Sequence, residues 1–151
     1  MSSVGDNGAV TSPRSIVVLG STGSIGTQAL DVARTHPEAL RVVGLSAAGT
    51  DPALLAAQAL EFGVEAVAVA RAGAAEDLLL AFYAEASKRG YERGEFAVPK
   101  ILTGPDAAAE LAAHPCDVVV NGITGSIGLR PTLAALRAGR TLALANKESL
   151  I

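Results

Sequence analysis

Residues 15–26, which read SIVVLGSTGSIG, decide the fold of this chain. The apolar run at 15–19 ends in Gly20, Gly23 and Gly26 follow, and a helical spacing of apolar residues begins at Ser24. A strand that leads through a glycine turn into a helix presents free backbone N–H groups to negative charge, and no Cβ atom blocks the approach. The pattern therefore predicts a turn that binds the diphosphate of a dinucleotide.

The glycine spacing is a weaker signal than its context. The spacing is G-x-x-G-x-x-G, whereas the commoner dinucleotide pattern is G-x-G-x-x-G, so the prediction depends on the strand before the turn and the helix after it. Thr22 and Ser24 add hydroxyl donors where phosphates would lie. The alternative is a tight turn whose glycines only allow the helix to pack closely on the strand.

Composition narrows the class of protein. The chain has 151 residues, of which 50% are hydrophobic and 18% charged, and this predicts one globular domain. Few aromatic residues, no Trp and a net charge of −3 argue against a nucleic-acid partner. No apolar segment is long enough to cross a membrane, and the N-terminus lacks a secretion signal. A single cysteine, Cys116, fits a reducing compartment, so we expect a cytoplasmic protein.

Strand-length apolar runs alternate with helical patterns along the whole chain, which predicts an α/β fold with a doubly wound, mostly parallel sheet of Rossmann-like topology. We expect a mobile tail at 1–14 and one nucleotide-binding domain at 15–151. Asp51 is the expected N-cap of the second helix, and Gly63 its C-cap. The predicted strands lie at 15–19, 41–47, 66–69, 101–102, 117–121 and 141–145. The predicted helices lie at 24–35, 52–62, 75–89, 106–113 and 129–138.

Two further loops follow predicted strands. Residues 124–128 repeat the sequence TGSIG of residues 22–26, and both copies follow an apolar strand, so both belong at the ligand-binding edge of the sheet. The second copy lines the far half of a dinucleotide site, or it is a turn without a ligand. The loop at 46–51 has no acidic residue at the strand end, which argues against NAD. It also contains no basic residue for a 2′-phosphate. Ser46, Thr50 and backbone amides are therefore the candidates for holding a phosphate.

The cluster Asn146-Lys147-Glu148 also follows a strand. Lys147 is a compact cation suited to a phosphate or a carbonyl, and Glu148 is a candidate ion-pair partner or ribose ligand. The alternative is a solvated polar turn. An apolar segment restarts at 149–151, so we expect the sequence to be truncated there. No spacing of acids and histidines resembles a metal site, and we expect His36 and His114 at the surface.

Three segments together resemble the 1-deoxy-D-xylulose 5-phosphate reductoisomerase family. They are the glycine loop at 20–26, GLRPTL at 128–133 and LANKESL at 144–150, of which the last is the most specific. The resemblance covers nearly all of the chain after the tail, and the stretch 137–141 fits it as well. It indicates the N-terminal NADPH-binding domain of such an enzyme.

The resemblance implies an activity and a set of site residues. The family uses NADPH to rearrange and reduce 1-deoxy-D-xylulose 5-phosphate, a phosphorylated sugar, to 2-C-methyl-D-erythritol 4-phosphate in the non-mevalonate route to isoprenoids. Magnesium or manganese acts as the Lewis acid, and the full-length enzyme is a homodimer. The family's metal ligands lie C-terminal to Ile151, so we expect no catalytic or metal-binding residue here and no turnover by this chain alone. The implied cofactor contacts are Thr22, Gly23, Ser24, Ile25, Gly49, Asn146 and Glu148, and the implied substrate contact is Lys147.

One position departs from the family pattern. Family members often carry a lysine and an asparagine after the glycine that matches Gly49, which lies near the adenosine 2′-phosphate. This sequence has Thr50 and Asp51 instead.

Two other functions agree with parts of the sequence. A semialdehyde dehydrogenase-like enzyme shares the glycine spacing but needs a nucleophilic cysteine at the ligand edge, and Cys116 precedes its strand. A stand-alone nucleotide sensor would account for the missing acids, but not for the apolar segment at the C-terminus.

Overall fold

The computed structural model describes residues 12–92, 94–123 and 128–144, and within them strands and helices alternate as predicted. The strands are β1 (Arg14–Leu19), β2 (Leu40–Ala47), β3 (Ala66–Val69), β4 (Lys100–Thr103), β5 (Val118–Asn121) and β6 (Thr141–Leu144). The helices are α1 (Ser24–Thr35), α2 (Pro52–Phe62), α3 (Ala75–Lys88), α4 (Ala107–Ala112) and α5 (Leu129–Arg137), with a short 3₁₀ turn, η1 (Ala72–Ala74), before α3.

The described strands form one six-stranded parallel sheet in the order β4-β3-β2-β1-β5-β6. The chain runs outward from β1 to β4 and then returns to the other side of β1 with β5. Leu19, the last residue of β1, is therefore aligned with Ser46 of β2 on one side and Asn121 of β5 on the other. In such sheets ligands bind outside the carboxyl ends of the strands, where the strand order reverses. Here that point lies between β1 and β5.

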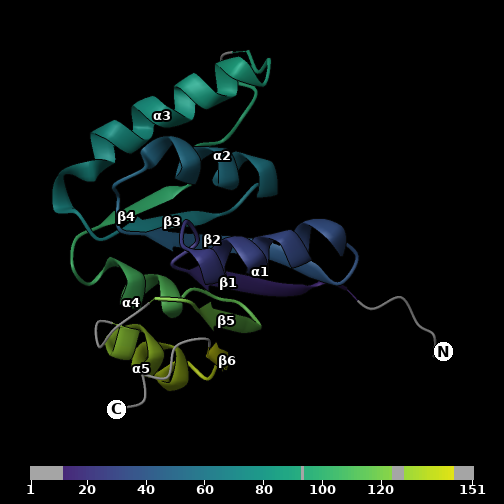
Figure 1. Cartoon of the computed structure of the whole chain (residues 1–151), viewed down its shortest axis with the longest axis vertical. Coiled ribbons are helices and arrows are strands. Elements are labelled where there is room, and N and C mark those ends of the chain that lie inside the picture. Colours follow the sequence, from purple (N-terminus) through teal and green to yellow (C-terminus); the bar gives the residue numbers. More distant parts are fainter. Residues whose placement is uncertain (1–11, 93, 124–127, 145–151) are drawn as a thin grey trace.

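Helices cover both faces of the sheet, so the prediction of a doubly wound fold is confirmed. Helices α1, α2 and α3 lie on one face, whereas α4 and α5 lie on the other (Figure 1). Successive residues of β1 point into different cores: Val18 packs with residues of α1 and α2, and Val17 and Leu19 pack with Leu111 of α4. Burial on both sides is the reason why the strands are continuously apolar.

The ends of α2 show how local sequence sets the element boundaries. The Asp51 carboxylate accepts a hydrogen bond from Leu54 N at 3.1 Å, and Pro52 occupies the first helical position. Gly63 ends the helix with a φ of 62°, in the left-handed region that favours glycine. Both predicted caps are therefore confirmed.

Most other boundaries lie within one or two residues of the prediction. β1 begins at Arg14 rather than Ser15, because Arg14 N donates to Ala39 O at 2.9 Å. Residues 1–11 of the predicted tail lie outside the described residues.

Candidate functional site

The glycine turn after β1 is fixed by hydrogen bonds to β2. Gly20 has a φ of 74°, and its N–H donates to the Ser46 hydroxyl at 3.1 Å. Ser21 N donates to Ser46 O at 2.8 Å, and Gly23 N to Gly20 O at 3.2 Å. The Ser46 side chain is only 2% exposed, so it anchors the turn. The sequence proposed Ser46 as a phosphate ligand; the structure instead shows its oxygen accepting the N–H of Gly20.

Four backbone N–H groups at this turn have no acceptor among the residues that the structure describes. They belong to Thr22, Ser24, Ile25 and Gly26, and the last three form the first turn of α1. The N-cap, Gly23, offers no side-chain acceptor to them. Open N–H groups combined with the positive end of the helix dipole make this turn suited to an anion.

The three glycines of the turn have different roles. A Cβ atom on Gly26 would lie 2.1 Å from Gly20 O, so Gly26 is needed for α1 to pack on the turn. A Cβ atom on Gly20 would lie 3.2 Å from the backbone of Gly122, which follows β5. At Gly23 the nearest atom would be 3.5 Å away, an ordinary contact, so this position is open to a ligand. Close packing, one interpretation of the glycine pattern, is therefore shown at Gly26, whereas ligand binding near Gly23 stays a prediction.

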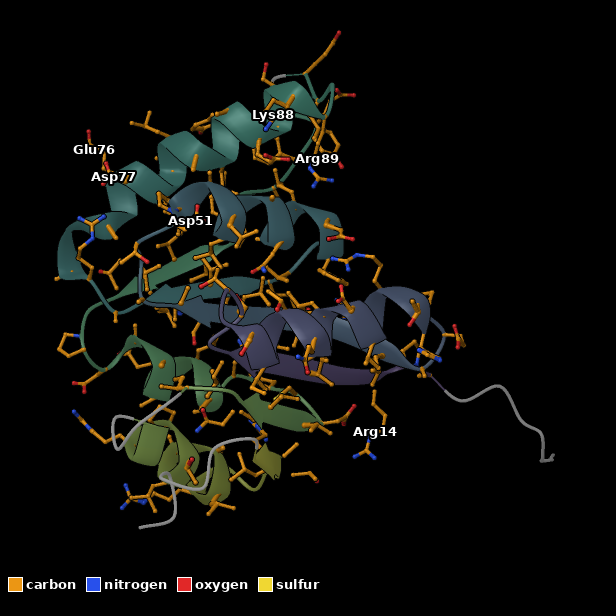
Figure 2. All side chains as sticks on the ribbon, in the orientation of Figure 1. Arg14, Asp51, Glu76, Asp77, Lys88 and Arg89 are labelled. Atoms are coloured by element: carbon orange, nitrogen blue, oxygen red, sulfur yellow. The ribbon has the colours of Figure 1, made fainter. Side chains whose placement is uncertain are left out.

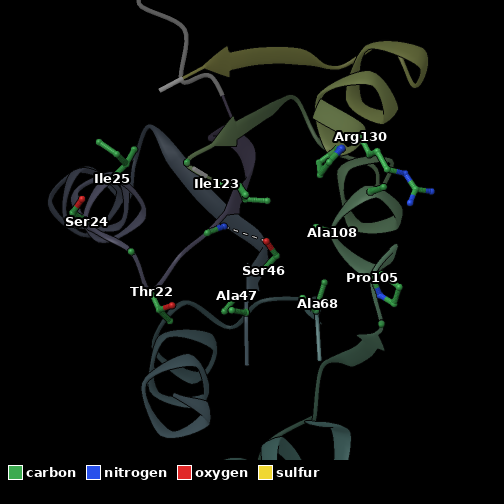
Figure 3. Close-up of a pocket in the computed structure, with 18 residues that line it drawn as sticks. Thr22, Ser24, Ile25, Ser46, Ala47, Ala68, Pro105, Ala108, Ile123 and Arg130 are labelled. Carbon is green, nitrogen blue, oxygen red and sulfur yellow. Dashed lines mark hydrogen bonds between the residues drawn. The ribbon is translucent and has the colours of Figure 1, made fainter. Parts of the chain in front are cut away.

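A cavity of about 500 Å³ opens at the carboxyl ends of the strands (Figure 3). The glycine turn and the start of α1 form one wall, and α4 with the start of α5 forms the opposite wall. Small residues at the ends of β2 and β3, among them Ala47 and Ala68, form its floor. The volume is in the range of pockets that hold small molecules and cofactors. Four of the predicted contacts, Thr22, Gly23, Ser24 and Ile25, line it.

Two buried polar pairs support the loops of the cavity, and no sequence motif predicts either of them. The Ser21 hydroxyl donates to Gln58 Oε1 of α2 at 2.8 Å, and Gln58 Nε2 donates back to Ser21 O at 3.0 Å. Ser21 is fully buried and Gln58 is 6% exposed. Because buried polar groups are costly unless they are paired, this reciprocal contact holds the turn in one orientation.

The second pair lies after β5. Asn121 is fully buried, and its Nδ2 donates to Thr132 Oγ1 at 2.8 Å and to Gly128 O at 3.0 Å. Its Oδ1 accepts from Ile123 N at 3.0 Å. Asn121 therefore ties the end of β5 to the start of α5 across residues 124–127. Those four residues, the first four of the repeated TGSIG motif at 124–128, lie outside the described residues.

An arginine that follows β3 contacts Gly49 in the loop after β2. Gly49 has a φ of 102°, and its carbonyl oxygen lies 3.5 Å from Arg71 Nη2. Arg71 follows β3, and its guanidinium also pairs with Asp77 at 3.2 Å. Gly49 lies beside the cavity, whose lining includes the neighbouring residue Ala48. The sequence pattern predicts no basic residue near Gly49, because Arg71 is 22 residues away. Only the pairing of β2 with β3 brings the two residues together.

Other candidate residues lie away from the cavity. Cys116 precedes β5 at the amino edge of the sheet, and burial raises the pKa of its thiol, which opposes a role as nucleophile. His36 is exposed as predicted, but the His114 side chain is only 24% exposed, because its Nε2 pairs with Glu65 Oε1 at 2.8 Å. Asn146, Lys147 and Glu148 lie outside the described residues.

The described residues contain neither a cluster of metal ligands nor a helix that could span a membrane. No three His, Cys, Asp or Glu side chains there are grouped so that they could hold a metal ion. Within the same residues no helix combines the length and the apolar character needed to cross a membrane.

Comparison with known proteins decides the family. The model of the 1-deoxy-D-xylulose 5-phosphate reductoisomerase family matches residues 16–151. The chain belongs to this family. The reductoisomerase of Streptomyces coelicolor is 59% identical over 139 residues, and that of Cutibacterium acnes is 54% identical over 138. These matches cover 92% and 91% of this chain, but the chain spans only about a third of either relative, 32% and 33%.

Solved reductoisomerase structures show the same fold. The enzyme of Zymomonas mobilis in complex with NADPH has a TM-score of 0.77 and 34% identity, over 91% of this chain and 33% of that one. A reductoisomerase in complex with NADPH, fosmidomycin and magnesium has a TM-score of 0.72 and 33% identity, over 91% of this chain and 31% of that one. The Rossmann-like sheet of this chain is therefore the one found in reductoisomerases.

Proposed function

We propose that this chain is the NADPH-binding part of an enzyme that converts 1-deoxy-D-xylulose 5-phosphate to 2-C-methyl-D-erythritol 4-phosphate. Membership of the reductoisomerase family supports the reaction, and a related structure contains NADPH. Because the chain spans about a third of its relatives, the turnover belongs to the longer enzyme, and the property to be tested here is binding.

The observation that carries the proposal is the set of open N–H groups at Thr22, Ser24 and Ile25, residues that line a cavity where the strand order reverses. These groups fit the diphosphate of NADPH, and Gly23 leaves room for it. The small residues Ala47 and Ala48 at the end of β2 leave space for the adenosine ribose and provide no carboxylate for a free 2′-hydroxyl. The cavity therefore fits a phosphorylated dinucleotide better than NAD.

NADPH supplies a hydride to the rearranged aldehyde. The residues described here bind and orient the cofactor: the turn at 22–26 holds the diphosphate, and Gly49 lies near the 2′-phosphate. We assign Asn146 and Glu148 to the cofactor and Lys147 to the substrate, on the resemblance of the motif LANKESL to the family. Lysine is suited to that role, because its ammonium is a compact charge for a sugar phosphate.

The metal site belongs elsewhere in this proposal. The described residues hold no cluster of metal ligands, and a related structure contains magnesium together with NADPH and fosmidomycin. We assign the magnesium or manganese ligands to the rest of the enzyme, because the chain spans only about a third of its relatives. A homodimer in the cytoplasm also remains part of the proposal and is supported by the family resemblance; light scattering of the full-length enzyme would test the dimer.

The proposal is tested by adding NADPH to the chain and following nicotinamide fluorescence. We expect saturable binding, with NADPH preferred to NADH. The sharpest variant is Ser24→Asp, which places a carboxylate at the exposed first position of α1. An acid there suits the helix dipole, so folding is preserved, but it repels a diphosphate. At about 4 Å in a partly screened site this repulsion weakens binding roughly tenfold or more.

Ser24→Asn is the matched control, because it has nearly the same shape as the aspartate without its charge. We expect this variant to bind NADPH within about threefold of the parent chain, since only the Coulomb repulsion is absent. Equal binding by the Asp and Asn variants would show that the diphosphate does not lie at this turn. Absence of saturable NADPH binding by the parent chain would refute the proposal itself.

A further inference from the structure

We propose that Arg71 is the residue that recognises the 2′-phosphate of NADPH. This inference rests on the NADPH binding proposed above and names the group that distinguishes NADPH from NADH. The usual source of such a cation is the loop after the second strand. In this chain that loop, residues 48–51, reads AGTD and contains no base, so the charge has to come from another element.

Backbone hydrogen bonds place Arg71 beside that loop. Ala70 N donates to Ala47 O at 3.1 Å, and Arg71 N donates to Ala48 O at 3.3 Å. These two bonds continue the pairing of β2 with β3 past the end of both strands. They carry Arg71 to the turn at Gly49, where its guanidinium Nη2 lies 3.5 Å from the Gly49 carbonyl oxygen.

The guanidinium is available to a ligand. Its ion pair with Asp77 joins two half-exposed side chains, 51% and 57% exposed, and such pairs contribute little because water screens them. Asp77 lies at the start of α3, at the opposite end of the helix from Lys88 and Arg89 (Figure 2). A guanidinium has five N–H donors in a planar fork that matches a phosphate, and only Nη2 has a partner within the described ranges. Exchanging one carboxylate for a phosphate dianion is therefore favourable.

Arg130 is the rival cation. It is among the residues that line the cavity, but it belongs to α5, and it pairs with Asp106 at 2.6 Å. In Figure 3 its guanidinium points away from Ala47, the last residue of β2. The ribose 2′ position of a dinucleotide lies at the carboxyl end of the second strand. Arg71 is at that strand end, whereas Arg130 is on the opposite wall.

The test compares 2′,5′-ADP with 5′-AMP by calorimetry on the 151-residue chain, because the two probes differ only in the 2′-phosphate. The parent chain should bind 2′,5′-ADP roughly tenfold or more tighter, as expected for one charge-assisted bidentate contact. Arg71→Gln should remove this preference and leave the Kd of 5′-AMP unchanged. Arg41→Gln is the matched control: Arg41 also forms an exposed ion pair, with Glu65 at 2.9 Å, and it should keep the preference.

Asp77→Asn provides an independent check. It removes the carboxylate that competes for Arg71, so 2′,5′-ADP should bind up to a few-fold tighter while 5′-AMP is unaffected. Weaker binding of 2′,5′-ADP by this variant would contradict the proposal.

The remaining outcomes separate this inference from the proposed function. A preference for 2′,5′-ADP that survives in Arg71→Gln, or that is lost in Arg130→Gln instead, overturns the role of Arg71 and leaves NADPH binding intact. Equal weakening of both probes by Arg71→Gln would indicate a structural role and also overturns it. If the parent chain binds neither NADPH nor either probe, the proposed function fails and this inference fails with it.

Discussion

Gly26 lies so close to Gly20 that a Cβ atom on Gly26 would stand 2.1 Å from the Gly20 carbonyl oxygen. No side-chain rotation relieves this contact, because both groups belong to the backbone. Gly26→Ala is therefore expected to displace α1 from the turn and to lower the free energy of unfolding by about 3 kcal/mol, at the upper end for overpacking. Urea denaturation measures this loss, and NADPH binding should fall with it.

Gly23→Ala is the control for that substitution within the same turn. Gly23 has a φ of −82°, which alanine adopts freely, and its Cβ would meet nothing nearer than 3.5 Å. We expect a loss of less than about 1 kcal/mol, which is the usual cost of alanine at an N-cap. Similar destabilisation by both alanines would contradict the different roles assigned to the two glycines.

The pair Ser21–Gln58 predicts a coupled loss of stability. Ser21→Ala leaves Gln58 Oε1 without its 2.8 Å donor in a buried site, which costs about 1–3 kcal/mol. Gln58→Leu removes both bonds that Gln58 makes with Ser21 and should cost a similar amount. In the double variant the two losses should not add, because each substitution removes the same contact. Additive losses in a double-mutant cycle would show that the pair does not act as a unit.

The pair Arg34–Glu61 predicts acid sensitivity. Arg34 Nη2 donates to Glu61 Oε1 at 2.9 Å, and this bond holds the pKa of Glu61 below its ordinary value. A lowered pKa in the folded state stabilises the fold above the unfolded pKa of about 4.3, and this contribution is lost as pH falls through the folded value. Glu61→Gln should make stability less dependent on pH below about pH 4.5. Chemical denaturation at several pH values would measure the change, and an unchanged slope would argue against the ion pair.

Cys116 predicts an unreactive thiol. Burial raises its pKa, so less thiolate is present at neutral pH than in a free cysteine. We expect iodoacetamide to alkylate the folded chain more slowly than it alkylates glutathione, and the two rates should converge after unfolding in urea. Cys116→Ser should bind NADPH like the parent chain, because Cys116 lies at the sheet edge opposite to the cavity. Loss of NADPH binding in this variant would show that the thiol contributes to the cofactor site.

Local sequence was sufficient to predict most of the fold. The cap at Asp51, the left-handed end at Gly63 and the apolar strand at 66–69 each depend on neighbours within a few residues, and all three are confirmed. The four residues of the glycine turn, 22–25, were likewise predicted at the site and line the cavity.

The missed features depend on contacts between distant segments. Gln58 reaches Ser21 across 37 residues, and Arg71 reaches Gly49 across 22. No periodicity or motif predicts such pairs, because the strand order and the helix packing determine which residues come into contact. The sequence pattern predicts Asn121 only as the last residue of a strand, although its side chain forms hydrogen bonds with Ile123 and Gly128 on either side of the following loop.

The place of β5 beside β1 has a consequence for how the domain is built. Ile16 pairs with Val118, so the second edge of β1 is hydrogen-bonded to a strand that lies about one hundred residues later in the sequence. Strands β1 to β4 are neighbours both in sequence and in the sheet. The wall of the cavity near Gly122, in contrast, requires that β5 is paired with β1. A cofactor that touches both walls therefore recognises only the finished sheet. Its binding should slow hydrogen exchange most in β5, whose pairing with β1 spans about one hundred residues of sequence.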